Sequence, residues 1–146
     1  MTTIACDGKI LAVDSQVTTG NSVAFYTNKL MRWSDGYFAL CGDFQHNGAF
    51  KAWLEKAHTS SERVPPETGG AFEDMSALFT DGDGVLYEVG DQLWPWESKI
   101  PAALGSGADI ALTVMRRGGT AVEAVREACK YDIHTGGRVN WVKISG

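Results

Sequence analysis

The chain has 146 residues, a length that predicts a single domain over residues 1–146. Hydrophobic residues make up 44% and charged residues 21%, which is typical of a soluble globular protein and argues against a disordered chain. The net charge of −5 argues against a nucleic-acid binder, because such proteins carry a basic patch or stripe. No apolar stretch approaches the ~20 residues that span a bilayer, and no secretory signal is visible, so we expect a cytoplasmic protein.

Three scattered cysteines, Cys6, Cys41 and Cys129, are too few for a disulfide framework, which needs an even and dense set. No C-x-x-C pair or histidine cluster points to zinc. We therefore expect three small buried hydrophobes in a reducing compartment.

The first part of the chain predicts two β-hairpins. Apolar runs at 2–6 and 9–13 flank Asp7-Gly8, a strong turn signal. Residues 18–21 predict a turn, and residues 29–33 and 37–41 form the second hairpin around Ser34-Asp35-Gly36.

From residue 44 the hydrophobic period changes to that of an amphipathic helix, which runs to about residue 57. A polar loop with two prolines follows at 59–70. A third hairpin is predicted from residues 75–79 and 85–89 around the acidic, glycine-rich residues 80–84.

The C-terminal part predicts two helices and a final strand. Residues 93–96 indicate a partly exposed strand or loop, and residues 108–115 a helix. The next helix begins at the capping box of Thr120 and Glu123, and residues 139–144 alternate as a strand. Trp53 and Trp141 fit core positions. Hairpins with segregated helices predict an α+β layered fold.

The N-terminus offers a candidate nucleophile. If Met1 is removed, Thr2 carries an α-amine beside its own hydroxyl. Such an amine has an ordinary pKa of about 7.7–8.0 and can act as a base near neutral pH. The pair would be a nucleophile and its base in one residue, although many structural proteins also begin with Met-Thr.

Asp14 and Lys29 lie at predicted strand ends, where they can pair under the N-terminus or form an ordinary surface salt bridge. Gly42 lies between a strand and a helix, where its N–H can bind an oxyanion or the glycine can serve only a tight turn. Ser106, between two glycines before a helix, can help to hold an anion or place a hydroxyl.

Two segments resemble the proteasome β-subunit and HslV-like family of N-terminal-nucleophile (Ntn) hydrolases. One is LAVDSQVTTGNSVA at residues 11–24 with Asn28-Lys29-Leu30, and the other is Asp132-x-x-Thr135-Gly136-Gly137-x-Val139. The Met-Thr-Thr-Ile start resembles HslV peptidases, which mature by losing only the methionine. The resemblance spans residues 2–144 and implies a four-layer α-β-β-α Ntn-hydrolase sandwich with two antiparallel sheets.

The resemblance implies a role for each matching residue. Thr2 matches the nucleophile, with its freed amine as general base, and Asp14 and Lys29 match the pair that tunes it. Gly42 matches the glycine of the oxyanion hole. The remaining matches are supporting polar residues near the nucleophile, namely Ser106 and Asp132.

The resemblance also implies binding positions. Thr18 matches a residue that holds the substrate backbone as a strand, and Leu40 falls in the primary specificity pocket. Backbone carbonyls of Cys129, Asp132 and Thr135 match a site for a sodium, potassium or magnesium ion. No cofactor is expected to be required for hydrolysis.

The chain departs from the family in two places. Only eleven residues lie between Thr2 and Asp14, so the first hairpin is short. The middle helical region is also shortened, because one helix and the loop around Pro65-Pro66 replace two long helices. Those helices help to build ring contacts in the family, which leaves ring size and docking to an ATPase open.

These features predict a threonine-type endopeptidase acting on peptides or unfolded proteins, with a homo-oligomeric ring and an ATPase unfoldase as expected partners, and no nucleic-acid or membrane partner. One alternative is a non-catalytic ring subunit, against which the retained Thr2, Asp14 and Lys29 argue. Another is an amidase of the same fold acting on a small amide. A third is a binding module whose Trp94 and Trp96 contact a partner.

Overall fold

The computed structural model describes residues 2–20, 22–59 and 72–144. Met1 and the predicted polar loop from residue 60 onward lie outside the described residues. The strands are β1 (Thr3–Cys6), β2 (Ile10–Val13), β3 (Gln16–Thr19), β4 (Ser22–Tyr26), β5 (Met31–Trp33), β6 (Gly36–Cys41), β7 (Ser76–Thr80), β8 (Leu86–Gly90), β9 (Trp96–Glu97), β10 (Ala102–Gly105) and β11 (Asn140–Lys143). The helices are α1 (His46–Thr59), α2 (Ala108–Arg116) and α3 (Ala121–Tyr131).

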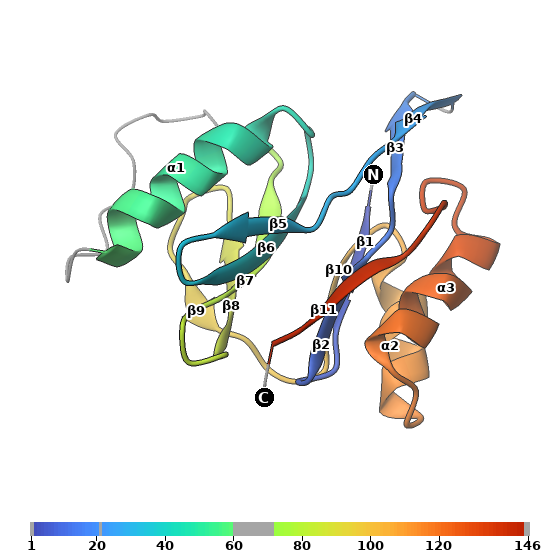
Figure 1. The fold of residues 1–146 in the computed structure, drawn as a ribbon. Coiled ribbons are helices and arrows are strands. Elements are labelled where there is room, and N and C mark those ends of the chain that lie inside the picture. Colours follow the sequence, from blue (N-terminus) through green and yellow to red (C-terminus); the bar gives the residue numbers. More distant parts are fainter. Residues whose placement is uncertain (1, 21, 60–71, 145–146) are drawn as a thin grey trace.

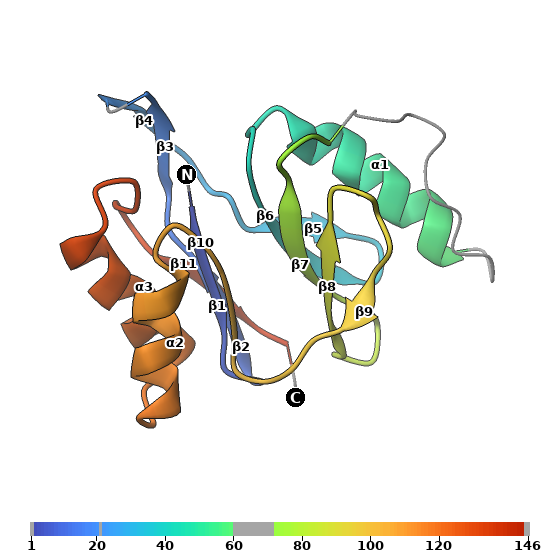
Figure 2. The same ribbon diagram turned by 180° about the vertical axis from the view of Figure 1, so that it is seen from behind.

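Two larger antiparallel sheets face each other, and helices cover their outer faces (Figures 1 and 2). One sheet has the strand order β10-β1-β2-β11 and the other β5-β6-β7-β8-β9. Helix α1 lies against the five-stranded sheet, while α2 and α3 lie against the four-stranded sheet (Figure 1). The short β3–β4 hairpin extends from the body close to the N-terminus (Figure 1).

Alternation along the strands explains the layers, because successive side chains point to opposite faces of a sheet. On β1, Ile4 and Cys6 face the other sheet, whereas Ala5 faces α2 and α3. On β6, Ala39 belongs to the core between the sheets, whereas Phe38 packs with residues of α1. The middle strands of the two sheets therefore pack on both faces, and small alanines allow the C-terminal helices to pack closely on the four-stranded sheet.

The three predicted hairpins are present as β1–β2, β5–β6 and β7–β8. The predicted helices correspond to α1, α2 and α3. Thr120 caps α3 as expected, because its hydroxyl accepts the Glu123 N–H at 3.1 Å. Among the described segments, no helix is both long and apolar enough to cross a membrane.

Two sequence predictions were wrong in part. Residues 18–21 predicted only a turn, but Thr18 and Thr19 belong to β3, which pairs with β4. Trp141 was expected in the core and is 50% exposed. It lies on β11, the edge strand of its sheet, where the neighbouring Val142 takes the core-facing position.

Candidate active site

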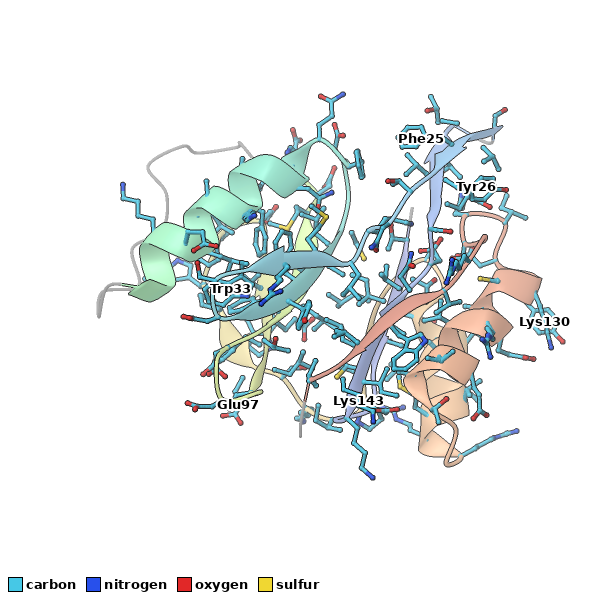
Figure 3. All side chains as sticks on the ribbon, viewed as in Figure 1. Phe25, Tyr26, Trp33, Glu97, Lys130 and Lys143 are labelled. Atoms are coloured by element: carbon cyan, nitrogen blue, oxygen red, sulfur yellow. The ribbon has the colours of Figure 1, made fainter. Side chains whose placement is uncertain are left out.

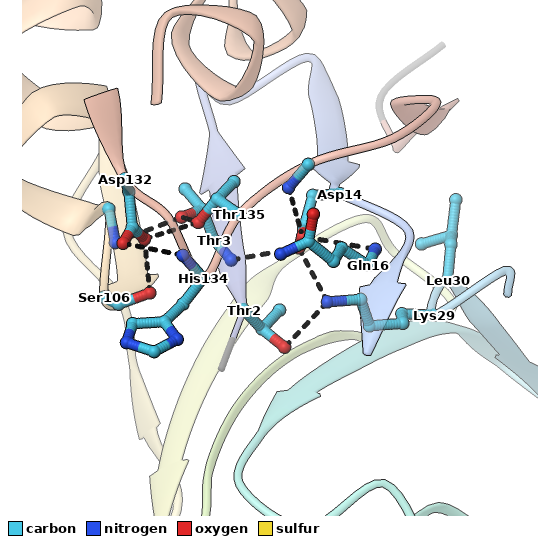
Figure 4. Close-up of polar contacts among 12 residues, drawn as sticks. Thr2, Thr3, Asp14, Gln16, Lys29, Leu30, Ser106, Asp132, His134 and Thr135 are labelled. Carbon is cyan, nitrogen blue, oxygen red and sulfur yellow. Dashed lines mark hydrogen bonds and ion pairs between the residues drawn. The ribbon is translucent and has the colours of Figure 1, made fainter. Parts of the chain in front are cut away.

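Three predicted side chains meet just before β1. The Lys29 ammonium donates a hydrogen bond to Thr2 Oγ1 at 2.9 Å and lies 2.8 Å from Asp14 Oδ1 (Figure 4). Thr2 precedes β1, Asp14 follows β2, and Lys29 lies shortly before β5. All three residues are buried. The predicted ion pair is therefore present and adjoins the hydroxyl of Thr2.

The backbone holds the Asp14 carboxylate in a fixed orientation. Its Oδ1 accepts the Thr3 N–H at 3.1 Å, and its Oδ2 accepts the Gly136 N–H at 3.1 Å and the Gln16 N–H at 3.4 Å. A buried carboxylate needs such donors as well as its cation. The carboxylate thus fixes where the Lys29 ammonium points.

Burial lowers the pKa of Lys29, and the facing Asp14 carboxylate offsets that effect only in part. In its protonated form, this lysine places a positive charge at hydrogen-bond distance from the Thr2 hydroxyl. A cation so placed favours ionisation of the hydroxyl and the neutral form of a nearby amine.

The Thr2 hydroxyl opens into a cavity of about 370 Å³ between the β3–β4 hairpin and the start of α1. Thr18 and Leu40, the two predicted substrate-binding residues, both line it. The other lining residues are Thr2, Gln16, Val17, Thr19, Phe25, Lys29, Gly42, Asp43, Phe44, Gln45 and Asn47. Phe25 of the hairpin and Phe44 of the loop before α1 meet edge to face, with ring centroids 5.7 Å apart.

Gly42 lines the same cavity directly after β6. Its φ of +124° is rarely adopted by other residues, and an added Cβ would lie 3.1 Å from the Asp74 carbonyl oxygen. The backbone conformation therefore favours glycine, and a larger residue would also make a tight contact at this wall of the cavity.

The whole chain is similar to solved structures of low sequence identity. Thiobacillus denitrificans BPH matches with a TM-score of 0.69, 18% identity and coverage of 99% of this chain and 98% of that one. The same protein in complex with epoxomicin matches with a TM-score of 0.66, 19% identity and 99% coverage of both chains. Eukaryotic HslV from Trypanosoma brucei matches with a TM-score of 0.70, 20% identity and coverage of 97% and 98%. The chain has the HslV/proteasome-like Ntn fold.

Comparison of the sequence alone finds no matching protein-family model and no matching curated protein. The HslV-like fold is thus shown by the structure comparison, and the predicted resemblance is confirmed at that level.

Ser106 and Asp132 form a second polar group beside Thr2 (Figure 4). The Ser106 N–H donates to the Thr2 carbonyl oxygen at 3.0 Å, and its hydroxyl bonds to Asp132 Oδ2. Asp132 also accepts the Thr135 hydroxyl at 2.5 Å and the His134 N–H at 3.1 Å. Burial acts to raise the pKa of Asp132, but these hydrogen bonds outweigh it and lower the pKa.

The expected ion site falls at the end of α3 and in the following turn, which carry Cys129, Asp132 and Thr135. The Asp132 carbonyl oxygen accepts the Thr135 N–H at 3.1 Å, which leaves it one lone pair for an ion. Within the described ranges, no three His, Cys, Asp or Glu side chains are grouped to hold a metal. An ion bound at this turn would therefore have to be held by backbone carbonyl oxygens.

The cysteines do not offer a competing nucleophile. Burial raises the pKa of Cys6 to about 11 and that of Cys41 to about 12, so both thiols are neutral at physiological pH. Cys129 is half-buried rather than buried, and burial raises its pKa as well.

Sequence reasoning missed Thr3 as a part of the site. The Thr3 hydroxyl lies 2.7 Å from the Thr135 hydroxyl and accepts the Gly107 N–H at 3.1 Å. A signal existed in the sequence, because Thr3 is a polar residue in a strand whose other members are apolar.

Proposed function

We propose that this protein is a threonine-type endopeptidase of the HslV/proteasome kind, with Thr2 as nucleophile after removal of Met1. One observation carries the proposal. Lys29 Nζ lies 2.9 Å from Thr2 Oγ1 and 2.8 Å from Asp14 Oδ1, at the wall of a cavity that can take a substrate side chain. The fold shared with HslV supports the same reading.

In the proposed reaction, Thr2 Oγ1 attacks the carbonyl carbon of a peptide, and the freed α-amine takes the hydroxyl proton. The new oxyanion accepts the Gly42 N–H. The C–N bond then breaks, and the amine passes its proton to the leaving nitrogen. Water hydrolyses the resulting ester by the same steps and restores Thr2.

The other site residues have supporting roles in this proposal. Lys29, oriented by Asp14, stabilises negative charge on Thr2 Oγ1. Ser106 holds the Thr2 backbone through its N–H and is itself bonded to Asp132. Thr18 would pair with the substrate as an added strand along β3, while Leu40 would contact the side chain that enters the cavity.

We further propose a homo-oligomeric ring served by an ATPase unfoldase in the cytoplasm, and a full four-layer sandwich in each subunit. Support for assembly comes from the β3–β4 hairpin, where Val23, Phe25 and Tyr26 are exposed. Figure 3 labels Phe25 and Tyr26 on this hairpin. Exposed apolar residues on a projecting hairpin are typical of contact surfaces. A sodium, potassium or magnesium ion bound to the backbone carbonyls of Cys129, Asp132 and Thr135 would stabilise the turn after α3 and take no part in hydrolysis.

The decisive experiment combines intact mass with labelling by a peptide epoxyketone, whose two electrophilic carbons react with a hydroxyl and an amine of one residue. We expect loss of Met1, stoichiometric labelling at Thr2, and hydrolysis of unfolded protein. Thr2→Ala should abolish labelling and hydrolysis, whereas Thr113→Ala, at an exposed hydroxyl on α2, should change neither.

Retention of Met1, or hydrolysis by Thr2→Ala at the parental rate, would contradict the mechanism. An active monomer or dimer that cleaves only small amides would favour the amidase alternative. An assembled but unlabelled ring would favour the non-catalytic subunit. Native mass spectrometry separates these assemblies.

A further inference from the structure

Thr3, the first residue of β1, is fully buried, yet its hydroxyl is at the centre of a polar chain. It accepts the Gly107 N–H at 3.1 Å and lies 2.7 Å from Thr135 Oγ1. The Thr135 hydroxyl donates its proton to Asp132 Oδ2, so Thr3 must be the donor to Thr135. The chain therefore runs from Gly107 through Thr3 and Thr135 to the Asp132 carboxylate.

The main chain of Thr3 contacts the other carboxylate of the site. Its N–H donates to Asp14 Oδ1 at 3.1 Å, and its carbonyl oxygen accepts the Asp14 N–H at 3.3 Å. One residue thus links Asp14, which orients Lys29, to Asp132, which bonds Ser106 (Figure 4).

The backbone before α2 approaches these groups closely. A Cβ added to Gly107 would lie 2.3 Å from Thr3 Oγ1, and one added to Gly105 would lie 1.7 Å from the Thr2 carbonyl oxygen. The turn between β10 and α2 is therefore pressed against residues 2 and 3. Movement of this turn would displace Ser106, and with it the Thr2 carbonyl that the Ser106 N–H holds.

We propose that Thr3 is a positioning residue for the peptidase reaction, because its hydroxyl holds the Gly105–Gly107 turn and the Asp132–Thr135 turn against β1. This inference rests on the proposed function and adds a residue to it. Thr3 touches no reacting atom, so its loss should lower kcat through misplacement of Thr2 and leave peptide binding in the cavity unchanged.

The test is Thr3→Val, which keeps the shape of the side chain and removes its hydroxyl. We expect kcat to fall about 10- to 100-fold, since misplacement of about 1 Å has an effect of this size. KM should stay within about twofold, because the cavity walls are unaltered. Thr3→Ser, which restores the hydroxyl, should recover most of the parental kcat.

Thr80→Val is the matched control. Thr80 is also buried in a strand, and its Oγ1 accepts the Tyr37 N–H at 3.0 Å, but it lies in the other sheet. We expect this variant to lower the melting temperature about as much as Thr3→Val while keeping the parental kcat. A purely structural role for Thr3 predicts the same kcat for both variants.

An active parent with equal kcat in Thr3→Val and Thr80→Val would overturn the inference and leave the proposed function standing. A correctly trimmed parent that hydrolyses nothing would overturn the proposed function itself. If Thr3→Val does not fold, Thr135→Val breaks the next link of the same chain, and an unchanged kcat in that variant would also overturn the inference.

Discussion

Asp14 lies between β2 and β3 and Lys29 between β4 and β5, and their charged groups are 2.8 Å apart with 0% and 5% of the side chains exposed. Isolated buried charges are costly, and a pair is tolerated only when further hydrogen bonds complete it. Here backbone N–H groups complete the carboxylate, and the hydroxyl of Thr2 accepts from the ammonium. A buried pair with a threonine hydroxyl as its third member is suited to tuning that hydroxyl.

Lys29→Met tests this pair because it removes the ammonium and leaves the buried carboxylate alone. We expect it to lower the free energy of unfolding by about 3–5 kcal/mol, as for other broken buried pairs. Hydrolysis should fall about 100- to 1000-fold through loss of charge stabilisation. Urea unfolding and steady-state kinetics measure the two effects.

A second substitution separates stability from chemistry in that experiment. Lys29→Met with Asp14→Asn removes both charges and should recover much of the lost stability but none of the activity. Lys130→Met, at an exposed pair with Glu127, should change stability by less than about 1 kcal/mol. Parental hydrolysis in Lys29→Met would show that the ammonium has no part in the reaction.

Gly42→Ala should impair hydrolysis, because alanine is strained at a φ of +124° and its Cβ would crowd the Asp74 carbonyl. Strain of this kind costs about 1–3 kcal/mol and would move the proposed oxyanion donor. Gly118→Ala is matched, since Gly118 has a φ of +95° with open space around it, at the end of α2. Gly118→Ala should be less stable than the parent and retain the parental kcat. An equal kcat in Gly42→Ala and Gly118→Ala would argue against an oxyanion role for Gly42.

Leu40→Ala should widen the cavity and shift preference toward peptides with larger side chains at the cleaved bond. Since one methylene changes selectivity about 10-fold or more, the ratio of kcat/KM for large over small side chains should rise by at least that factor. Leu78→Ala, in the core between the sheets, should destabilise the protein and leave the ratio unchanged. A constant ratio in Leu40→Ala would mean that Leu40 lies outside the specificity pocket.

The lowered pKa of Asp132 predicts a pH-dependent contribution to stability. Its folded pKa lies below the ordinary 3.8, so the stabilisation is complete above about pH 4 and is lost as pH falls through the lowered value. The stability difference between the parent and Asp132→Asn should therefore be largest near neutral pH and shrink in acid. Urea unfolding from about pH 7 to pH 2 measures it; a difference that stays constant would refute the prediction.

Asp7→Asn is the control variant that separates an effect on stability from an effect on catalysis. Burial acts to raise the pKa of Asp7, but backbone N–H groups of Ala121, Lys9 and Ile10 outweigh it and lower the pKa. The difference in free energy of unfolding between the parent and Asp7→Asn should therefore also shrink in acid. Asp7→Asn should keep the parental kcat at neutral pH. Asp132→Asn should lose hydrolysis at that pH, because Ser106 loses its charged partner.

The hairpins were predictable because their signals are local. Asp7-Gly8 sets its turn through its own side chain and backbone, with Asp7 Oδ1 accepting the Lys9 and Ile10 N–H groups at 2.8 Å. The exposure of Trp141 was not predictable in this way, because alternation separates the two faces of a strand without saying which face is covered.

The candidate site was only partly visible in the sequence. The motifs indicated Thr2, Asp14 and Lys29, and these meet in the structure. The role of Thr3 depends on a contact with Thr135 across 132 positions, which no local pattern encodes. The same holds for Phe25 and Phe44, whose edge-to-face contact forms across the cavity.

The strand pairing of the β1–β2 hairpin also sets the position of Thr2 relative to Lys29. Ile4 is opposite Val13 and Thr3 is opposite Gly105, and in this pairing Thr2 Oγ1 lies 2.9 Å from Lys29 Nζ. A slip of one position would carry Ile4 and Cys6 to the helix-covered face and bring Thr3 where Thr2 belongs. Asp7, in the turn of this hairpin, also accepts the Ala121 N–H at the start of α3, at 2.9 Å. The length of a turn at the far end of the sheet therefore decides which hydroxyl faces the cavity.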